Sequence, residues 1–481
     1  MRSIVIHGHF YQPPRDDPWL GAIPREASAA PYHDWNERIE RESYAPVAAS
    51  LASLSFDFGP TLLAWMERHA AATYGAVLAA DRAGVAAHAG HGNAIAMPYH
   101  HTILPLSSRR DKETEVRWGI ADFRRRFGRE PEGMWLPETA VDDETLDVLA
   151  AEGIRFTILA PHQVERVPAG GRPGGHRTAA GRRIALFLYD GPLSHDVAFG
   201  PLVRDPAAWI ERLTAREGGN GGGGGGGGGS VDVPEVLAIA TDGETFGHHH
   251  REGAVTLARV LDALRKRGDV RVDNFAAFLA RHPPQDDVRL VAPSAWSCPH
   301  GVERWRSDCG CRVHGDRATH QRWRAPLRNA LDWLAAELHR VFEREGSTIF
   351  AADPWTVRDV YGSVLGAPDD AVTRFIGERL RRPDDRSALA RAGELLELER
   401  HALRMFTSCG WFFDDIAGLE SLIVLRSAAR AIELAGTDAA RLEAGLLERL
   451  ALAPSNDPAV GTGRELYVKG MKAVPARGVP T

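Results

Sequence analysis

The chain has 481 residues, of which 44% are hydrophobic and 25% are charged, which suffices for a large core or for about two to three domains. Its net charge of −6 argues against nucleic acid as a main partner, because phosphate binding requires a basic surface. Its four cysteines do not make a disulfide scaffold in a chain of this length.

Targeting and membrane signals are not visible in the sequence. The first apolar run, Ile4-Val5-Ile6, is too short for the core of a secretory signal. No stretch approaches the roughly 18 uncharged apolar residues of a membrane span. We therefore expect a cytoplasmic protein without a membrane partner, and the oligomeric state stays open.

The first 290 residues alternate short apolar runs with helical patterns. The predicted strands are residues 3–7, 54–58, 85–89, 132–136, 155–159, 184–189 and 235–241. The predicted helices are residues 61–68, 112–127, 143–152, 206–216 and 253–267. Such alternation indicates parallel strands covered by helices. The expected fold is α/β, an incomplete (β/α)7 barrel, one unit short of the eightfold type.

A run of glycines interrupts this pattern at residues 218–230. Such a run behaves as a flexible coil and predicts a loop insertion before the last barrel strand. Neither a Gly-Lys-Ser/Thr sequence nor a helix follows it, which argues against a phosphate-binding loop.

From about residue 325 onward the pattern is only helical. Apolar residues recur at three- and four-residue spacing in Leu327, Leu331, Leu334, Leu338 and Phe342, which indicates an amphipathic helix. Further helices are predicted at 356–365, 388–406, 416–435 and 438–450. The expected domains are a catalytic barrel (1–290), a Trp/Cys/His-rich connecting segment (291–325), an α-helical bundle domain that completes the active-site cleft (326–455) and a partly disordered tail (456–481).

Two predicted strands lead into carboxylates, Glu138 and Asp242. Strand ends of such barrels carry catalytic groups, and two carboxylates facing one substrate are the usual means of breaking a glycosidic bond. For Glu138 the alternative is a charge at the start of the helix that follows, where acids are favoured. Glu244 competes with Asp242, although Gly243 allows a turn that aims Asp242 inward.

Histidines and other polar residues follow the same strand ends. His7 and His9 lie two residues apart on one strand and therefore share a face. Three roles are compatible with this placement: binding of substrate hydroxyls, ligation of a metal, or hydrogen bonding within a polar core. His91 and Asn93 follow the predicted third strand and suit a sugar. The run His248-His249-His250 is more often solvated or hydrogen bonded than bound to metal.

The connecting segment contains Cys298, His300, Cys309, Cys311 and His314. Structural zinc sites usually have two to four residues between paired cysteines. The spacings here are Cys-x-His and Cys-x-Cys, which are off that pattern, so the sequence favours reduced thiols packed near Trp296 and Trp305 over a metal site.

Taken together, these segments resemble glycoside hydrolase family 57, in particular its bacterial α-amylase/α-mannosidase-like branch. The resemblance covers roughly residues 1–450. It is carried by His7–Arg15, Gly90–Leu106, Gly133–Glu138, Ala240–His250 and the later Trp-rich and helical parts, which include Thr407–Phe413.

The resemblance implies retaining hydrolysis or transfer at α-glucosidic bonds of an α-glucan or oligosaccharide, without metal or other cofactor. It places Glu138 as nucleophile and Asp242 as general acid/base, which requires carboxyl groups about 5–5.5 Å apart. The candidate substrate-binding residues are His7, His9, Gln12, His91, Asn93, Trp135, His248, Trp296 and Trp411. The family commonly has Gln and Glu where this chain has His91 and Asn93, which leaves open the sugar and the choice between amylase and branching activity.

Two other functions are compatible with the sequence. One is a metal-dependent α-mannosidase or carbohydrate deacetylase on a related barrel, with His7, His9, Asp242 and His248 as ligands. The lack of a clear second aspartate in the first segment counts against it. The other is a non-catalytic carbohydrate-binding or regulatory protein, against which the intact Glu138 and Asp242 argue.

Overall fold

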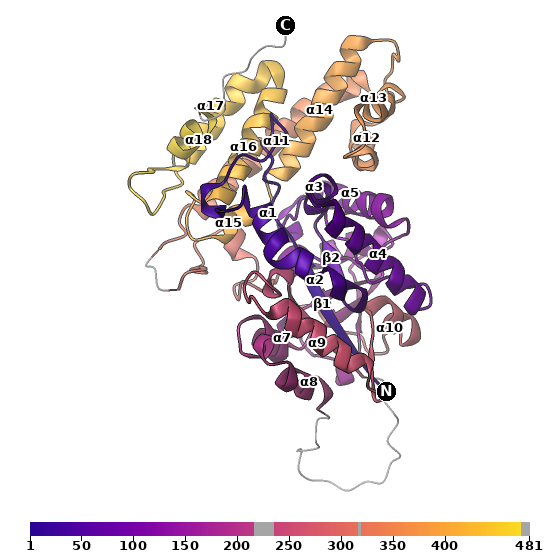
Figure 1. Cartoon of the computed structure of the whole chain (residues 1–481). Helices are drawn as coiled ribbons and strands as arrows, with labels where there is room; N and C mark the ends of the chain where they lie inside the picture. Colours follow the sequence, from indigo (N-terminus) through magenta and orange to yellow (C-terminus); the bar gives the residue numbers. More distant parts are fainter. Residues whose placement is uncertain (216–234, 316–318, 473–481) are drawn as a thin grey trace.

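The computed structural model describes residues 1–215, 235–315 and 319–472, so the predicted glycine loop lies outside the described residues. Figure 1 shows an α/β part, drawn below, and a helical part stacked on it, drawn above. No described helix is both long and apolar enough to cross a membrane.

The strands of the α/β part form two small sheets. Their bounds are β1 (Arg2–Phe10), β2 (Ser55–Phe58), β3 (Phe156–Leu159), β4 (Gly174–Arg177), β5 (Arg183–Leu188), β6 (Val236–Asp242) and β7 (Val270–Val272). In the first sheet β1 pairs in parallel with β2, β6 and β7. In the second, β5 pairs in parallel with β3 and antiparallel with β4.

Isolated bridges link the two sheets in a ring-like order. They join Phe56 to Ala94, Ala96 to Met134 and Gly133 to Phe156. On the other side, the Asp190 amide donates a 2.8 Å hydrogen bond to the Ala238 carbonyl of β6. A buried cluster drawn from these segments lies between them, with Val5, Trp135, Ile158, Phe187 and Ala240 among its members.

This arrangement confirms a mixed α/β part, and it corrects one predicted strand. Residues 85–89 overlap the end of helix α4 (Ala71–Ala87), and the chain segment that joins the strands is instead 94–96. Residues 132–136 contribute single bridges rather than a regular strand. The error at 85–89 arose because a short apolar run does not distinguish a strand from part of a helix.

Helices flank the strands of this part. Besides α4 they are α1 (Trp35–Ile39), α2 (Ala45–Val47), α3 (Pro60–His69), α5 (Arg109–Phe127), α6 (Asp143–Ala151), α7 (Gly191–Ala198), α8 (Pro206–Thr214), α9 (Gly253–Arg265) and α10 (Phe275–Arg281). Local sequence fixes the ends of α5, because the Ser108 hydroxyl accepts from the Asp111 amide and Gly128 ends the helix at φ +68°.

The helical part confirms the helical pattern of the second half. Its helices are α11 (Arg324–Ile349), α12 (Pro354–Tyr361), α13 (Asp369–Gly377), α14 (Arg386–Arg404), α15 (Cys409–Phe412), α16 (Leu419–Leu434), α17 (Ala439–Leu450) and α18 (Gly463–Lys472). All the predicted apolar positions of α11 are buried. Helix α18 lies within the predicted tail, so the expected disorder does not extend over residues 463–472.

Candidate active site

Side chains alternate between the two faces of β1, and its polar residues point into the centre of the α/β part. Ile4 and Ile6 belong to the outer apolar cluster, whereas Val5 belongs to the central one. His7 and His9 continue the parity of Val5 and therefore project toward the centre. This agrees with the prediction that both histidines share one inward face.

Asp57 on β2 joins these histidines, and sequence reasoning did not identify it. Its carboxylate bonds His7 Nε2 at 3.0 Å through Oδ1 and His9 Nδ1 at 2.8 Å through Oδ2. All three side chains are buried. The alternation of residues in β2 could have identified it. Phe56 and Phe58 face the outer cluster, so Ser55 and Asp57 must face inward.

The second ring nitrogen of His9 meets another histidine that was not predicted. His9 Nε2 lies 3.2 Å from His101 Nε2, and His101 Nδ1 lies 2.7 Å from Ser408 Oγ in the helical part. Burial lowers the pKa of His101 far below its ordinary value, and the charge of His9 lowers it further. A neutral His101 accepts from His9 and donates to Ser408, which fixes the tautomer of both rings.

His9 is the positive charge of the site. It pairs in register with Asp57 on β2 and with Asp242 on β6. Burial alone would lower the pKa of His9, but Asp57, with smaller contributions from Asp242 and Glu244, raises it to about 9. The imidazolium form therefore persists at neutral pH, surrounded by carboxyl groups.

Asp242 has the opposite perturbation. Burial raises the pKa of Asp242 to about 7, where the positive charge of His9 opposes the increase and the charges of Glu244 and Glu138 add to it. Burial and the charge of Glu138 are the two causes expected for an acid that stays protonated near neutrality. The side chain is only half-buried, so its carboxyl remains accessible from the centre.

Glu244 is held differently from Asp242. Its Oε1 accepts a short hydrogen bond from the Tyr44 hydroxyl, and the residue is buried. Burial raises the pKa of Glu244 as well, while that hydrogen bond opposes the increase. Because a structural partner occupies its carboxylate, Glu244 is less free than Asp242 to meet a substrate.

Glu138 adopts a strained backbone conformation. Its φ is +58° and that of Thr139 is +48°, in the left-handed region that costs non-glycine residues about 1–2 kcal/mol each. The Trp296 amide donates to the Glu138 carbonyl at 3.0 Å, and Gln163 Nε2 donates to the Thr139 carbonyl at 2.8 Å. Strain that neighbouring bonds maintain is characteristic of functional positions.

Two donors fix one oxygen of the Glu138 carboxylate. Ser297 Oγ donates to Oε2 at 2.6 Å and Trp296 Nε1 donates to the same atom at 3.1 Å. Within the described part of the chain, no donor is bonded to Oε1, which leaves this oxygen free to react. Sequence reasoning named Trp296 as a sugar contact and did not identify Ser297.

Aromatic rings connect the two carboxylates. Trp135 is fully buried and stacks on His7 and His9, with ring centroids 4.9 and 5.1 Å away. Its edge contact with Trp296 spans 5.1 Å. Trp296 in turn lies 6.3 Å from the ring of Tyr189, whose pKa rises through burial and through the charge of Asp242.

Trp411 does not face this site with an open ring. It is 1% exposed, its Nε1 donates to the Arg324 carbonyl, and its ring is parallel to Phe406 within the core of the helical part. Trp135 is likewise buried, so both rings support surrounding residues. Neither presents an uncovered face to a sugar in this structure.

His91 and Asn93 lie at the wrong end of the chain segment for a substrate contact. Both precede the bridged residues 94–96, whereas Glu138 follows its bridged residues 133–134. Asn93 donates to the Leu51 and Ala52 carbonyls and accepts from Asn274, and His91 pairs with Glu132. The misplaced strand at 85–89 caused this error. At the correct end of this segment lie His100 and His101.

The remaining predicted contacts, Gln12 and His248, have protein partners. Gln12 Oε1 accepts from Arg15 at 3.2 Å, and His248 Nδ1 lies 2.5 Å from Glu42. Among the described residues, the one set of His, Cys, Asp or Glu that could share a metal ion is Cys298, His300, Cys309 and Cys311. The predicted set of His7, His9, Asp242 and His248 is therefore not brought together.

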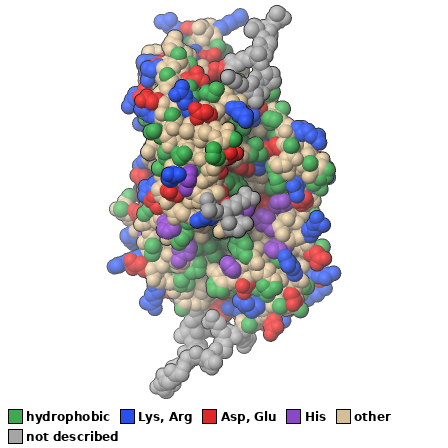
Figure 2. Space-filling model, turned by 90° about the vertical axis from the view of Figure 1, so that its left-hand side faces the viewer, with side chains coloured by type: hydrophobic (Ala, Val, Ile, Leu, Met, Phe, Trp, Pro, Cys, Tyr) green, Lys and Arg blue, Asp and Glu red, His purple; other side chains and the backbone are tan. Residues whose placement is uncertain are grey.

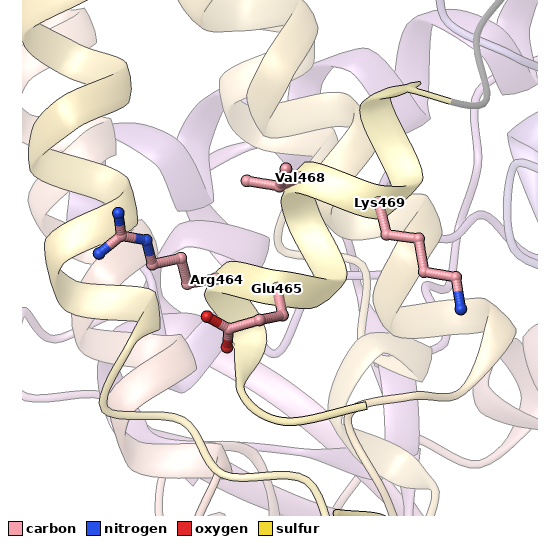
Figure 3. A pocket seen from close by; sticks show the side chains of 4 residues that line it. All are labelled: Arg464, Glu465, Val468 and Lys469. Carbon is pink, nitrogen blue, oxygen red and sulfur yellow. The ribbon is translucent and has the colours of Figure 1, made fainter. Parts of the chain in front are cut away.

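Two hollows on the surface are lined by residues other than Glu138 and Asp242. One is lined by Arg464, Glu465, Val468 and Lys469, which project from the single helix α18 (Figure 3). A second is lined by residues between Gly21 and His69. Figure 2 shows exposed histidines at mid-height of one face of the molecule, whereas His7, His9 and His101 are buried.

Two protein-family models match this chain. Residues 63–290, which include Glu138 and Asp242, match the model of glycosyl hydrolase family 57. Residues 319–476 match the model of a domain of unknown function, DUF3536. The chain therefore contains a glycoside hydrolase family 57 domain followed by a DUF3536 domain, which confirms the family expected from the sequence.

Individual relatives are more distant. A probable 1,4-α-glucan branching enzyme of Mycobacterium tuberculosis is 26% identical over 243 residues, 43% of this chain and 46% of its own length. This chain thus spans about half the length of the curated relatives it matches.

Solved structures share the fold. An exo-type maltose-forming amylase from Pyrococcus sp. ST04 has a TM-score of 0.73 at 16% identity, over 94% of this chain and 83% of that one. A family 57 branching enzyme from Pyrococcus horikoshii has a TM-score of 0.56 at 15% identity, over 98% and 94% of the two chains. Likeness at this identity concerns the fold, which hosts more than one activity.

Proposed function

We propose that this chain hydrolyses or transfers α-glucosidic bonds of an α-glucan or oligosaccharide with retention of configuration, on an incomplete (β/α)7 barrel. Glu138 is the nucleophile and Asp242 the general acid/base. The observation that carries the proposal is the raised pKa of Asp242, about 7, beside a Glu138 carboxylate that has one oxygen fixed and one free.

In the first step, Glu138 Oε1 attacks the anomeric carbon. The bond from that carbon to the glycosidic oxygen breaks, and the oxygen takes the proton of Asp242 as it leaves. In the second step, the Asp242 carboxylate removes a proton from water or a sugar hydroxyl. The resulting oxygen attacks the anomeric carbon and releases Glu138.

Asp242 must act as an acid in the first step and as a base in the second, so its pKa must fall between the two steps. The charge of Glu138 gives a physical reason for this fall. The negative charge of Glu138 is one of the causes that raise the pKa of Asp242. Once Glu138 is esterified in the glycosyl-enzyme, that charge is gone and the pKa of Asp242 falls. The residue that acted as an acid then acts as a base.

The family 57 match at 63–290 and the α-glucan-active names of the relatives support this substrate class. The metal-dependent alternative needs His7, His9 and Asp242 as ligands, with His248 as a further candidate. Asp57 already bonds His7 and His9, and Glu42 bonds His248. No observation therefore favours the alternative.

Azide rescue tests the two assignments separately. On an aryl α-glucoside with a good leaving group, Glu138→Gly should lose nearly all turnover and regain it with azide, giving the β-glucosyl azide. Asp242→Gly should retain the first step, because this leaving group needs no proton, and azide should give the α-glucosyl azide. Full turnover in either variant without azide, or exchanged azide products, would overturn the assignments.

A further inference from the structure

We infer that Cys298, His300, Cys309 and Cys311 form a structural zinc site that holds the segment carrying Trp296 and Ser297 against Glu138. The site itself is independent of the proposed function. Its effect on Glu138 rests on that function. The two claims are therefore tested by different measurements.

The distances between the four side chains fit a tetrahedral ion. With zinc–sulfur and zinc–nitrogen bonds of about 2.3 and 2.0–2.1 Å, a tetrahedron separates two sulfurs by about 3.8 Å and a sulfur from a nitrogen by about 3.6 Å. The Sγ atoms of Cys298 and Cys311 are 3.8 Å apart, and His300 Nδ1 is 3.6 Å from Cys311 Sγ and 4.0 Å from Cys298 Sγ. With Cys309, all four ligand atoms lie within 4.8 Å of one another.

The unusual spacing follows from the local backbone. Gly310 has φ +82°, so the chain turns sharply there and both neighbouring thiols can face one centre. Cys298 is buried, while Cys309 and Cys311 are half-buried and His300 is exposed. One-residue gaps are therefore compatible with a common centre, although they differ from the usual two-to-four-residue gaps.

Two buried arginines supply the electrostatic complement. Arg324 is fully buried and Arg304 is 5% exposed, and within the described ranges neither forms an ion pair with a carboxylate. Arg324 Nη1 lies 3.8 Å from Cys309 Sγ, and Arg304 Nη1 donates to the Ser297 carbonyl at 3.0 Å. Three thiolates, a neutral imidazole and Zn²⁺ have a net charge of −1, which adds to the charge of Asp414 near Arg324 in compensating these buried cations.

The ligand chemistry selects the metal and its role. A tetrahedral set of sulfur and imidazole ligands is typical of zinc. With four protein ligands no coordination position remains for a substrate, so the site is structural. His314 lies outside it, because its Nδ1 pairs with Asp414 at 3.1 Å.

The position of the site in the chain gives its effect. Cys298 directly follows Ser297 and Trp296, the two residues that donate to Glu138 Oε2. A zinc ion fixes Cys298 against residues 309 and 311, and thereby limits the movement of both donors. Trp296 and Ser297 are thus positioning residues whose geometry the metal maintains.

Metal analysis of the full chain, purified under reducing conditions after growth with zinc, tests the site. We expect close to one zinc per chain, and a Co²⁺-substituted protein with visible bands of tetrahedral thiolate coordination. Cys309→Ser and His300→Ala should lose most of the metal. The matched controls Cys409→Ser and His314→Ala should keep it.

Two results would overturn the site. One is protein that neither contains zinc nor takes up added zinc, with either four reactive thiols or a disulfide. The other is full zinc retention in Cys309→Ser and His300→Ala. Because His300 is exposed, His300→Ala keeps the test valid if Cys309→Ser fails to fold.

Kinetics test the effect on Glu138. Zinc removal should lower kcat at least tenfold with KM within about twofold, as Ser297→Ala should, and added zinc should restore kcat. Zinc-bound protein with no glycosidic activity would contradict the proposed function and leave the site intact. An active enzyme whose kcat is the same with and without zinc would contradict only the positioning role.

Discussion

At the scale of single residues, the positive φ of Glu138 distinguishes it from the other acidic residues that the structure describes. The side chain must enter the centre directly after a bridged segment, and the left-handed conformation aims it there. The hydrogen bonds from Trp296 and Gln163 to this turn hold it against the intrinsic preference of the backbone. A charge that merely favours a helix start would not require such a conformation.

The strain at Glu138 predicts an inverted ranking of two truncations. Alanine is ordinarily more favourable than glycine in regular structure by about 0.5–1 kcal/mol. At φ +58°, Glu138→Gly should instead be more stable than Glu138→Ala by about 1 kcal/mol, because only glycine adopts this conformation without steric cost. Both variants lose the same carboxylate, so denaturant unfolding isolates the backbone contribution. A more stable alanine variant would contradict the strain.

The raised pKa of Asp242 predicts the alkaline limit of activity. The acid must be protonated for the first step, so activity is present below its pKa and is lost as pH rises through about 7. His9→Asn removes the positive charge that lowers this pKa while keeping a donor for Asp57. The alkaline limb of kcat/KM should then move to higher pH. A limb that stays in place or moves to lower pH would contradict the lowering of the Asp242 pKa by the charge of His9.

At the scale of elements, the sequence predicts well those segments whose patterns are local. The strands β1, β2, β3, β5 and β6 and the helices α5 and α11 agree with the apolar runs and helical periodicity of the sequence. Residues 85–89 do not, because a short apolar run alone does not distinguish a strand from the end of helix α4. That one misplaced strand assigned His91 and Asn93 to the catalytic end. His101 lies in the segment Gly90–Leu106 that carries the family resemblance, but its contact with His9 appears only in the fold.

The residues of the site also differ in how far local sequence patterns predict them. Glu138 and Asp242 are each recognisable from an apolar run that ends in a carboxylate. Ser297 and Ser408 are distant in sequence from the residues they bond, and no local pattern connects them to Glu138 or His101. Asp57 is intermediate, because the alternation in β2 gives its orientation but only the fold gives its partners.

The close approach of α5 to the segment after residue 96 predicts a sensitive glycine. A Cβ at Gly119 would lie 2.0 Å from the Met97 carbonyl oxygen, and this segment leads to His100 and His101. Gly119→Ala should therefore destabilise by about 1–3 kcal/mol and lower activity, because backbone must move.

The matched control is Gly75→Ala in α4, where no atom lies within 4 Å of the added Cβ. Here the usual advantage of alanine in a helix should stabilise by about 0.5–1 kcal/mol. Thermal or denaturant unfolding of both variants gives the comparison. Equal effects of the two substitutions would mean that α5 can shift away from Met97 at little cost.

At the scale of the whole molecule, buried polar networks unite the helical and α/β parts. Arg358 of α12 is fully buried and bonds Asp111 and Thr114 of α5 at 2.9 and 2.8 Å, and Glu399 of α14 at 2.7 Å. His339 of α11 completes the network through Glu399 at 3.0 Å. Shared charges therefore join the helical part to α5 of the α/β part.

This network predicts how stability depends on pH. Burial would lower the pKa of His339, but Glu399 and Asp111 raise it to about 10, against about 6.5 in the unfolded chain. Between these values the folded state binds the proton more tightly, so its contribution to stability is complete below pH 6.5. The contribution is lost as pH rises toward 10, by up to about 1.4 kcal/mol per pH unit.

His339→Gln should remove this contribution, so the free energy of unfolding should fall less steeply with pH between 6.5 and 9.5 than in the unmodified chain. His9 titrates in part of the same range in both proteins, so the difference between the two slopes belongs to His339. Denaturant unfolding at several pH values measures it, and the solvent-exposed His195→Gln controls for histidine removal itself. Parallel slopes would mean that His339 holds no proton in the folded state, and the interface would then depend on Arg358 as its central cation.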